Sequence, residues 1–216
     1  MARLPPPPGS VSLTRPAWRA APAPATHIEF DDYQKEVIAC DAKLIVARAF
    51  AGAGKTATSI GYSEARPNAS FLQLCFNKAN QLEAERRFGG HVQCRTLNSL
   101  AYAAVGHKFR NQLTNQWRPR TFAAEHKLTD TRQAALLQDV LTRFFVSADA
   151  SVKPAHVLSL ADKWAIQDSN VEYIAAQANM VWAKIRQPGS GVSMTHDAYF
   201  KMWALSNPVL SQFSHI

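Results

Sequence analysis

The sequence lacks any apolar run near the roughly 20 residues that a helix needs to cross a bilayer. Its three cysteines, Cys40, Cys75 and Cys94, stand far apart, with neither a CxxC pair nor a histidine spacing that suits zinc. The opening segment MARLPPPPGS turns to proline after one arginine, so it has no apolar core of a secretory signal. These absences predict a soluble chain in a reducing, cytoplasmic setting.

Acidic residues are also scarce, with 16 Asp and Glu against 24 Lys and Arg, and the formal net charge is +8. The excess lies at the two ends of the chain. Residues 1–26 contain three arginines and no acid, and residues 105–216 contain twelve basic residues against eight acidic ones. This distribution favours a polyanionic partner.

The amino-terminal half has two parts of different character. Residues 1–26 hold seven of the twelve prolines and show no apolar periodicity, which predicts a disordered tail. Residues 27–106 alternate short apolar runs with helical patterns. We expect strands at 44–49, 71–76 and 92–96, and helices at 55–65, 79–88 and 97–105. This alternation predicts an α/β fold with a parallel sheet covered on both faces.

Residues 107–205 predict a mainly helical insertion. One helical pattern is marked by Leu137, Val140, Leu141, Phe144 and Phe145. A second helical stretch is expected from Pro154 to about Gln167. A capping box formed by Ser169 and Glu172 would then begin a third helix.

The segment AFAGAGKT, residues 49–56, matches the phosphate-loop pattern except at its first residue, which is alanine rather than glycine. It follows an apolar run and opens a predicted helix, so backbone N–H groups and the helix start would surround phosphates. Gly52 and Gly54 permit the tight path. Lys55 would place its charge at the β and γ phosphates of ATP, and Thr56 would offer its hydroxyl to Mg²⁺.

Upstream of this loop, Gln34 offers a side-chain amide that can pair with the N6 donor and N7 acceptor of adenine. A solvated glutamine on a helix face is the other interpretation. The predicted nucleotide contacts are Gln34, Ala51, Gly52, Ala53, Gly54, Lys55, Thr56 and Ala57.

These features together resemble superfamily 1 DNA helicases of the UvrD/Rep type, most closely the F-box DNA helicase group, from about Phe30 to the last residue. DDYQKEVI, which contains Gln34, matches the family's Gln motif, and AFAGAGKT matches its AxAGxGKT loop. CFNK matches its Phe-Asn-Lys segment, and TLNS matches its Thr-Phe-His-Ser segment with Asn98 in place of histidine. The resemblance implies single-stranded DNA contacts at Phe76, Asn77, Lys78, Thr96, Asn98 and Ser99.

The residues themselves point to the same place, because Asn77, Lys78, Thr96 and Ser99 follow the carboxyl ends of two predicted strands. Ligands of open α/β sheets bind at that edge, and such side chains can position a phosphate backbone. The alternative is that they cap the helices that follow.

A basic stretch in the insertion is interleaved with Phe109 and Trp117. Its cationic residues are His107, Lys108, Arg110, Arg118 and Arg120. Two interpretations stay open: it tracks a nucleic-acid backbone and stacks bases, or it is a solvated loop with its aromatic residues turned inward. Trp164, Trp182 and Trp203 follow helical patterns and are expected in the core.

The resemblance implies a RecA-like P-loop motor domain that is only partly present. Residues 27–106 would be its first part, residues 107–205 its insertion, and residues 206–216, with Phe213, the start of a returning core strand. The family's acidic Walker B motif would follow that strand, so we expect a chain truncated before it.

The implied function is the ATP-binding portion of a helicase that moves 3' to 5' on single-stranded or forked DNA, with a missing remainder as partner. Turnover by the chain alone is not expected. The alternatives are a nucleotide-binding interaction protein without turnover and a different P-loop enzyme such as a small-molecule kinase. The expected location is the cytoplasm, with nucleoid association in a bacterium or the nucleus in a eukaryote.

Overall fold

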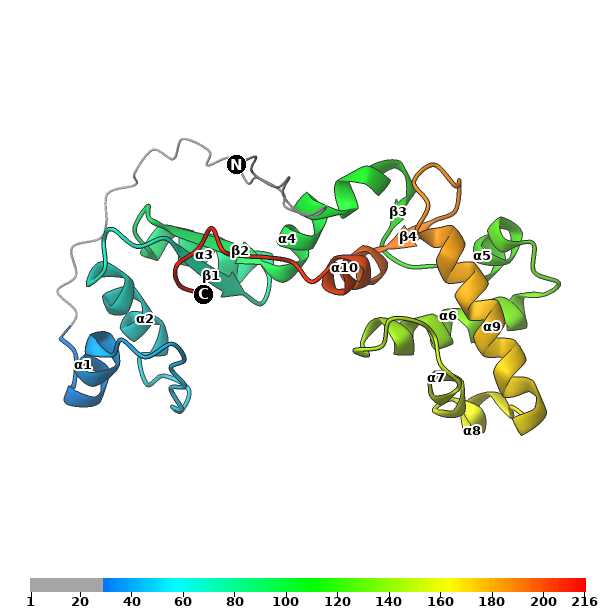
Figure 1. The fold of residues 1–216 in the computed structure, drawn as a ribbon, viewed down its shortest axis with the longest axis horizontal. Coiled ribbons are helices and arrows are strands. Elements are labelled where there is room, and N and C mark those ends of the chain that lie inside the picture. The colour runs from blue at the N-terminus through cyan, green and yellow to red at the C-terminus, as the bar shows by residue number, and fades with distance from the viewer. Residues whose placement is uncertain (1–28) are drawn as a thin grey trace, which may run out of the picture. The chain divides into compact units, whose positions relative to one another are not determined.

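The computed structural model describes residues 29–216, and the tail expected at residues 1–26 lies outside the described residues. The described residues form two compact units (Figure 1). The first, here called the sheet unit, comprises residues 29–99 and 209–216. The second, here called the helical unit, comprises residues 100–208. The chain is therefore a helix-rich α/β protein with few strands.

The sheet unit is built around two parallel strands. Its elements are α1 (Asp32–Ala39), α2 (Lys55–Glu64), β1 (Phe71–Cys75), α3 (Lys78–Arg87), β2 (Val92–Thr96) and the start of α4 (Leu97–Ala104). The register of β1 and β2 runs from Phe71 opposite Val92 to Cys75 opposite Thr96. These bounds confirm the three helices and the two strands expected between residues 55 and 105.

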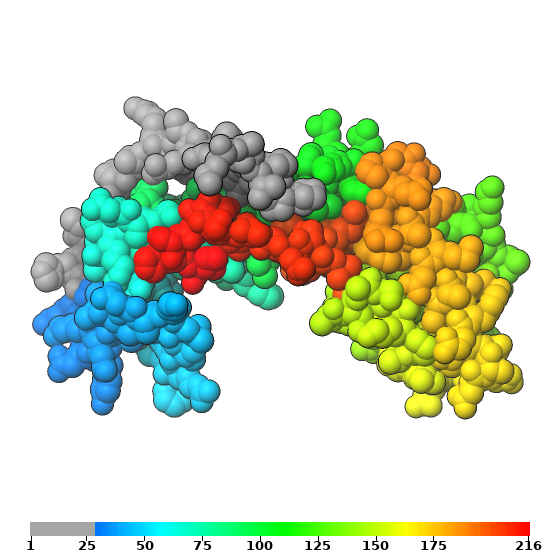
Figure 2. All heavy atoms as spheres, in the orientation of Figure 1, coloured from blue at the N-terminus to red at the C-terminus, as the bar shows by residue number. Residues whose placement is uncertain are grey.

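The last residues of the chain join the other edge of β1. His215 forms a parallel bridge with Phe71, and its carbonyl accepts a hydrogen bond of 2.9 Å from the N–H of Leu72. The rings of Phe71 and His215 stack with centroids 4.5 Å apart, and Tyr62 of α2 meets Phe71 edge-on at 6.0 Å. In Figure 2 these residues, in red, lie against the cyan part of the unit. Where the start of a returning core strand was expected, the structure has this single bridge at His215, and the neighbouring Phe213 is buried.

The strand expected at residues 44–49 is wrong. This segment has no strand conformation, and the side chains of Leu44 and Val46 are 80% and 69% exposed. A parallel strand buried on both faces needs neighbours that pair with its backbone. Within the described residues β1 pairs with β2 and His215, and no strand lies beside residues 44–49. The apolar run therefore stays in solvent.

The helical unit packs its helices around α6. Its elements are the 3₁₀ helix η1 (Gly106–Gln112), β3 (Leu113–Thr114), α5 (Pro119–His126), α6 (Thr131–Phe145), α7 (Pro154–Leu158), α8 (Ala161–Trp164), α9 (Asp168–Ile185), β4 (Met194–Thr195) and α10 (His196–Leu205). The two short strands pair in parallel. Leu137, Val140, Leu141 and Phe144 of α6 are fully buried, and Phe144 meets Trp182 of α9 edge-on at 5.5 Å. The apolar face expected on α6 is confirmed.

Two expected helix features in this unit are wrong. The stretch from Pro154 to Gln167 is broken into α7, which ends at Leu158, and α8, which begins at Ala161 and ends before Ala165 in the left-handed region. The capping box expected at Ser169 is not formed: the N-cap of α9 is Gln167, two residues earlier, and it has no capping side chain, so Ser169 lies within the first turn. Among residues 29–216, no helix combines the length and hydrophobicity needed to cross a membrane.

Candidate functional site

Two glycines set the backbone path of the loop at residues 49–56. Gly52 and Gly54 have φ values of 82° and 74°, in the left-handed region that residues with a Cβ rarely adopt. Gly54 is the N-cap of α2, and a Cβ built on it would lie 2.6 Å from the Nε2 atom of Gln34. The loop thus needs glycine at both positions, and it delivers the exposed residues Lys55 and Thr56 to the first turn of α2.

The side chain of Lys55 lies across this loop. Its Nζ donates to the carbonyl of Ala49 at 3.0 Å and to that of Phe50 at 2.8 Å. The N–H of Ala53 donates to the same Phe50 carbonyl at 3.3 Å, so the loop closes on itself. The ammonium charge and the positive start of α2 lie within one short segment. This arrangement attracts an anion.

The structure brings Gln34 to the same loop from α1. Its Oε1 accepts from the N–H of Asp31 at 3.0 Å in a capping box, and its Nε2 lies 3.5 Å from the carbonyl oxygen of Ala53. A contact of 3.5 Å is a weak hydrogen bond that an adenine ring can replace at little cost. Gln34 therefore meets Ala53 and Gly54 at one point of the loop, although Gln34 and Ala53 are 19 residues apart in the sequence.

The remaining predicted nucleotide contacts flank this point. Ala51, Gly52 and Thr56 are exposed, and Ala57 is half-buried on the inner face of α2. Figure 2 shows the segment between α1 and α2, in light blue, at the edge of the sheet unit. The whole loop is thus accessible to a ligand.

The predicted DNA contacts form a second set at the carboxyl edge of the two strands. Cys75 and Thr96 are the last paired residues of β1 and β2, so Phe76, Asn77 and Lys78 leave the sheet beside Thr96, Asn98 and Ser99. The side chain of Phe76 is 93% exposed, and those of Lys78 and Asn98 are exposed as well.

Part of this second set caps helices. The Oδ1 of Asn77 accepts from the N–H of Asn80 at 2.8 Å, and the Oγ1 of Thr96 accepts from the N–H of Ser99 at 3.0 Å. The hydroxyl of Ser99 donates back to the Thr96 carbonyl at 2.8 Å. The capping interpretation is therefore confirmed for Asn77 and Thr96. Contact with DNA at this edge stays a prediction.

Replacement of Asn77 should report this cap directly. We expect Asn77→Ala to lower the free energy of unfolding by about 1 kcal/mol, because the first turn of α3 loses its side-chain acceptor. Asn77→Ser should stay within a few tenths of a kcal/mol of the parent, since serine also caps well. Urea unfolding followed by circular dichroism measures both, and equal stability of the two variants would show that the cap contributes nothing.

The basic stretch of the helical unit turns its aromatic residues inward. Phe109 and Trp117 are buried, and the indole Nε1 of Trp117 donates to the carbonyl of Ser193 at 3.1 Å. The base-stacking interpretation is wrong for these two rings, because neither face is open to a base. The basic residues His107, Lys108, Arg110, Arg118 and Arg120 are exposed. Trp182 and Trp203 are core residues as expected, and Trp164 is half-buried with its indole donating to Asp139.

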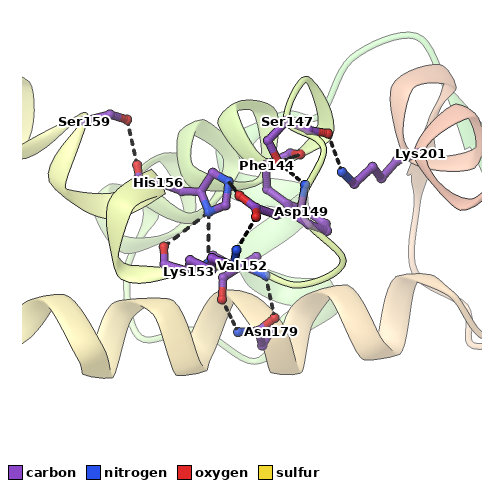
Figure 3. Close-up of polar contacts among 9 residues, drawn as sticks. All are labelled: Phe144, Ser147, Asp149, Val152, Lys153, His156, Ser159, Asn179 and Lys201. Atoms are coloured by element: carbon purple, nitrogen blue, oxygen red, sulfur yellow. Dashed lines mark hydrogen bonds and ion pairs between the residues drawn. The ribbon is translucent and has the colours of Figure 1, made fainter. Parts of the chain in front are cut away.

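A polar cluster in the helical unit was not foreseen from the sequence (Figure 3). The carboxylate of Asp149 pairs with Lys153 and lies 3.3 Å from the Nε2 of His156. A hydrogen bond from Lys153 lowers the pKa of Asp149. The buried ammonium of Lys201 donates to the carbonyl of Ser147 at 2.7 Å, and burial lowers its pKa. These groups bind one another and fix the link between α6 and α7, so we assign the cluster a structural role.

Sequence reasoning also missed Arg66, which follows α2. Its guanidinium joins α2 to the carboxyl end of α1, the helix that carries Gln34. No motif marks this residue, because its partners are mainly backbone carbonyl groups.

Metal binding has limited support from side chains. Among residues 29–216, no group of three or more His, Cys, Asp and Glu is arranged to hold a metal ion. Mg²⁺ in nucleotide sites is held largely by phosphate oxygens and water, with one or two protein oxygens. The exposed hydroxyl of Thr56 at the start of α2 fits that modest role.

The known proteins that match the chain include two F-box DNA helicases. The chain is 25% identical to F-box DNA helicase 1 of Gallus gallus over 190 residues, which are 81% of this chain and 19% of that protein. It is 37% identical to F-box DNA helicase protein 1 of Schizosaccharomyces pombe over 75 residues, which are 33% of this chain and 8% of that protein. The chain thus spans a small part of these relatives. No family model and no solved structure matches it. The similarity relates the chain to the F-box DNA helicases.

Proposed function

We propose that the chain is the ATP-binding portion of a DNA helicase whose complete form moves 3' to 5' on DNA with ATP. The observation that carries this proposal is the junction of Gln34 with the loop at 49–56, where two left-handed glycines open α2 beside Lys55. In this proposal residues 27–106 and 206–216 belong to a UvrD/Rep-like P-loop domain. Residues 107–205 are its helical insertion.

Each nucleotide contact has a physical role in this proposal. Lys55 exchanges its bonds to the Ala49 and Phe50 carbonyls for the β and γ phosphates, a stronger charge-assisted contact. Thr56 supplies one oxygen to Mg²⁺, which when bound neutralises charge on the phosphates. Gln34 exchanges its weak contact with Ala53 for the edge of adenine.

The DNA partner in this proposal is a single strand at the carboxyl edge of β1 and β2. The exposed ring of Phe76 is two residues from the exposed ammonium of Lys78, and Asn98 comes from the neighbouring strand end. An aromatic ring beside a cation can stack a base and hold a phosphate without reading sequence. Forked DNA would offer the same single strand.

A second function, nucleotide binding without turnover, applies to the chain by itself. Residues 29–216 match the Gln motif, the P-loop and the two DNA-contact segments of the helicase family, and they contain no match to its acidic or arginine motifs. Binding and turnover are separable, because a phosphate cradle can hold ATP without the groups that stabilise the transition state.

Calorimetric titration of the full chain with ATP and Mg²⁺ tests the proposed function. We expect saturable binding at one site. A flat titration at millimolar nucleotide would remove the ATP-binding assignment.

Binding of single-stranded DNA is expected to fall steeply as salt rises. Each phosphate contact adds about −0.7 to the slope of log affinity against log salt, because it releases counterions. Lys78→Ala should therefore make the slope less negative by about 0.7. Fluorescence anisotropy with a labelled oligothymidine measures the slope, and Lys163→Ala, which removes an exposed lysine paired with Asp139, is the matched control.

Two outcomes would contradict this assignment. Salt-independent binding, or no binding at low salt, would exclude a phosphate-backbone contact by the chain. Equal slopes for the Lys78→Ala and Lys163→Ala variants would exclude Lys78 from it.

A further inference from the structure

The guanidinium of Arg66, which follows α2, makes five contacts, two of them with carbonyls at the carboxyl end of α1. Its Nη1 donates to the carbonyl of Ile38 at 2.8 Å and to that of Tyr62 at 3.3 Å. Its Nη2 donates to the carbonyl of Cys40 at 3.0 Å and to the carboxylate of Asp41 at 2.7 Å. Its Cζ lies 3.9 Å from the centroid of the Tyr62 ring. The side chain is 18% exposed, so most of it is packed within the unit.

The helix that Arg66 contacts, α1, is short and has no buried residue. α1 is eight residues long, none of its residues is buried, and its last turn carries no basic residue. A helix this short is marginal without tertiary contacts. Arg66 binds carbonyls at its carboxyl end, where helices leave acceptors unpaired and favour positive charge. Arg66 thus supplies, at the carboxyl end of α1, the positive charge that the last turn of α1 does not carry itself.

Close packing at Gly61 completes the attachment. A Cβ built on Gly61 of α2 would lie 2.7 Å from the ring of Phe30 and 2.8 Å from Ile38. α1 therefore touches α2 directly at this point. Gln34 lies in the first turn of α1 and contacts the loop, while Arg66 holds the last turn. The position of the Gln34 amide depends on both ends of the helix.

We propose that Arg66 is a positioning residue that holds α1 so that Gln34 faces the adenine side of the loop, and that it thereby sets the preference for adenine over other bases. This inference rests on the proposed ATP site. Arg66 does not touch the loop in the structure; its effect passes through α1. Phosphate binding by Lys55 and the start of α2 should not depend on it.

The test measures base preference and phosphate affinity separately. Calorimetry gives the affinity of the full chain for ATP, for GTP and for inorganic tripolyphosphate, each with Mg²⁺. The variants are Arg66→Ala, Arg66→Lys, Gln34→Ala and the double variant. Arg87→Ala is the matched control, because Arg87 lies at the end of α3 and pairs with Glu83 of its own helix.

We expect Arg66→Ala to lower the ATP-to-GTP affinity ratio about fivefold to tenfold, because Gln34 would lose one or two hydrogen bonds to adenine. The affinity for tripolyphosphate should not change. Arg66→Lys should fall between the parent and Arg66→Ala, since one ammonium cannot span the carbonyls that the planar fork reaches. In the Gln34→Ala background, Arg66→Ala should change nothing further. Arg87→Ala should match the parent.

The outcomes separate this inference from the proposed function. If the parent chain binds neither ATP nor tripolyphosphate, the ATP site itself is wrong. If the parent prefers ATP and Arg66→Ala keeps the full preference, only the role of Arg66 is overturned. The role is also overturned if Arg66→Ala loses tripolyphosphate binding in parallel, which would show a general effect on folding, or if it lowers the ratio further without Gln34.

Discussion

Purified chain is expected to hydrolyse ATP no faster than background, with or without single-stranded DNA, although we propose that it binds ATP. In phosphoryl transfer the protein contributes positioning and charge stabilisation. Positioning and charge stabilisation need three groups in addition to the loop at 49–56: an acidic residue that holds magnesium, a group that orients water, and an arginine at the γ phosphate. An arginine finger alone is worth about a thousandfold or more in turnover, so a chain without counterparts of these groups should hydrolyse ATP at close to the uncatalysed rate.

Steady-state phosphate release is the measurement, with Lys55→Ala as the control for contaminating ATPases. Duplex unwinding by the same preparation should also be absent. DNA-stimulated turnover that Lys55→Ala abolishes would contradict the expectation. It would mean that a carboxylate of this chain, such as Asp162 or Asp197, aligns the attacking water.

Replacement of Lys55 is expected to weaken ATP binding by about 1.5 to 3 kcal/mol, which is roughly tenfold to 150-fold in affinity. Its ammonium lies on the carbonyls of Ala49 and Phe50, within the loop that would surround the phosphates. Removal takes away the charge-assisted phosphate contact. The variant also has no bonds to these two carbonyls to give up on binding, which offsets a small part of the loss.

Calorimetry on Lys55→Ala and on the matched variant Lys35→Ala measures this loss. Lys35 is an exposed lysine of α1 that pairs with Asp32, so its removal changes the net charge equally without touching the loop. Thermal unfolding of both variants separates binding from folding. Equal ATP affinity of the two variants would remove Lys55 from the phosphate site.

Local patterns predicted the elements whose formation depends on nearby residues. The strands at Phe71–Cys75 and Val92–Thr96 pair with each other across one helix, and the α6 face marked by Leu137 is fully buried. The same reasoning failed at residues 44–49, because an apolar run indicates burial without providing a strand to pair with. It also failed at Ser169, where Gln167 of the preceding turn takes the cap position.

The candidate site was predictable where its residues lie close together in the sequence, as they do in the loop at 49–56. Gly52, Gly54 and Lys55 follow one another in the loop, and their conformations agree with what the pattern needs. Arg66 was not predictable, because it binds the carbonyls of Ile38 and Cys40, which any residue type would present. The inward turn of Trp117 depends likewise on a carbonyl 76 residues away.

Photolabelling of the full chain with an ATP analogue that carries an azide on its adenine ring tests most directly whether Gln34 and the loop form one ATP site. Mass spectrometry then locates the label. The account predicts label on peptides that contain residues 31–57, lost when unmodified ATP competes and reduced in the Lys55→Ala variant. Label confined to other peptides, or label that ATP does not displace, would contradict it.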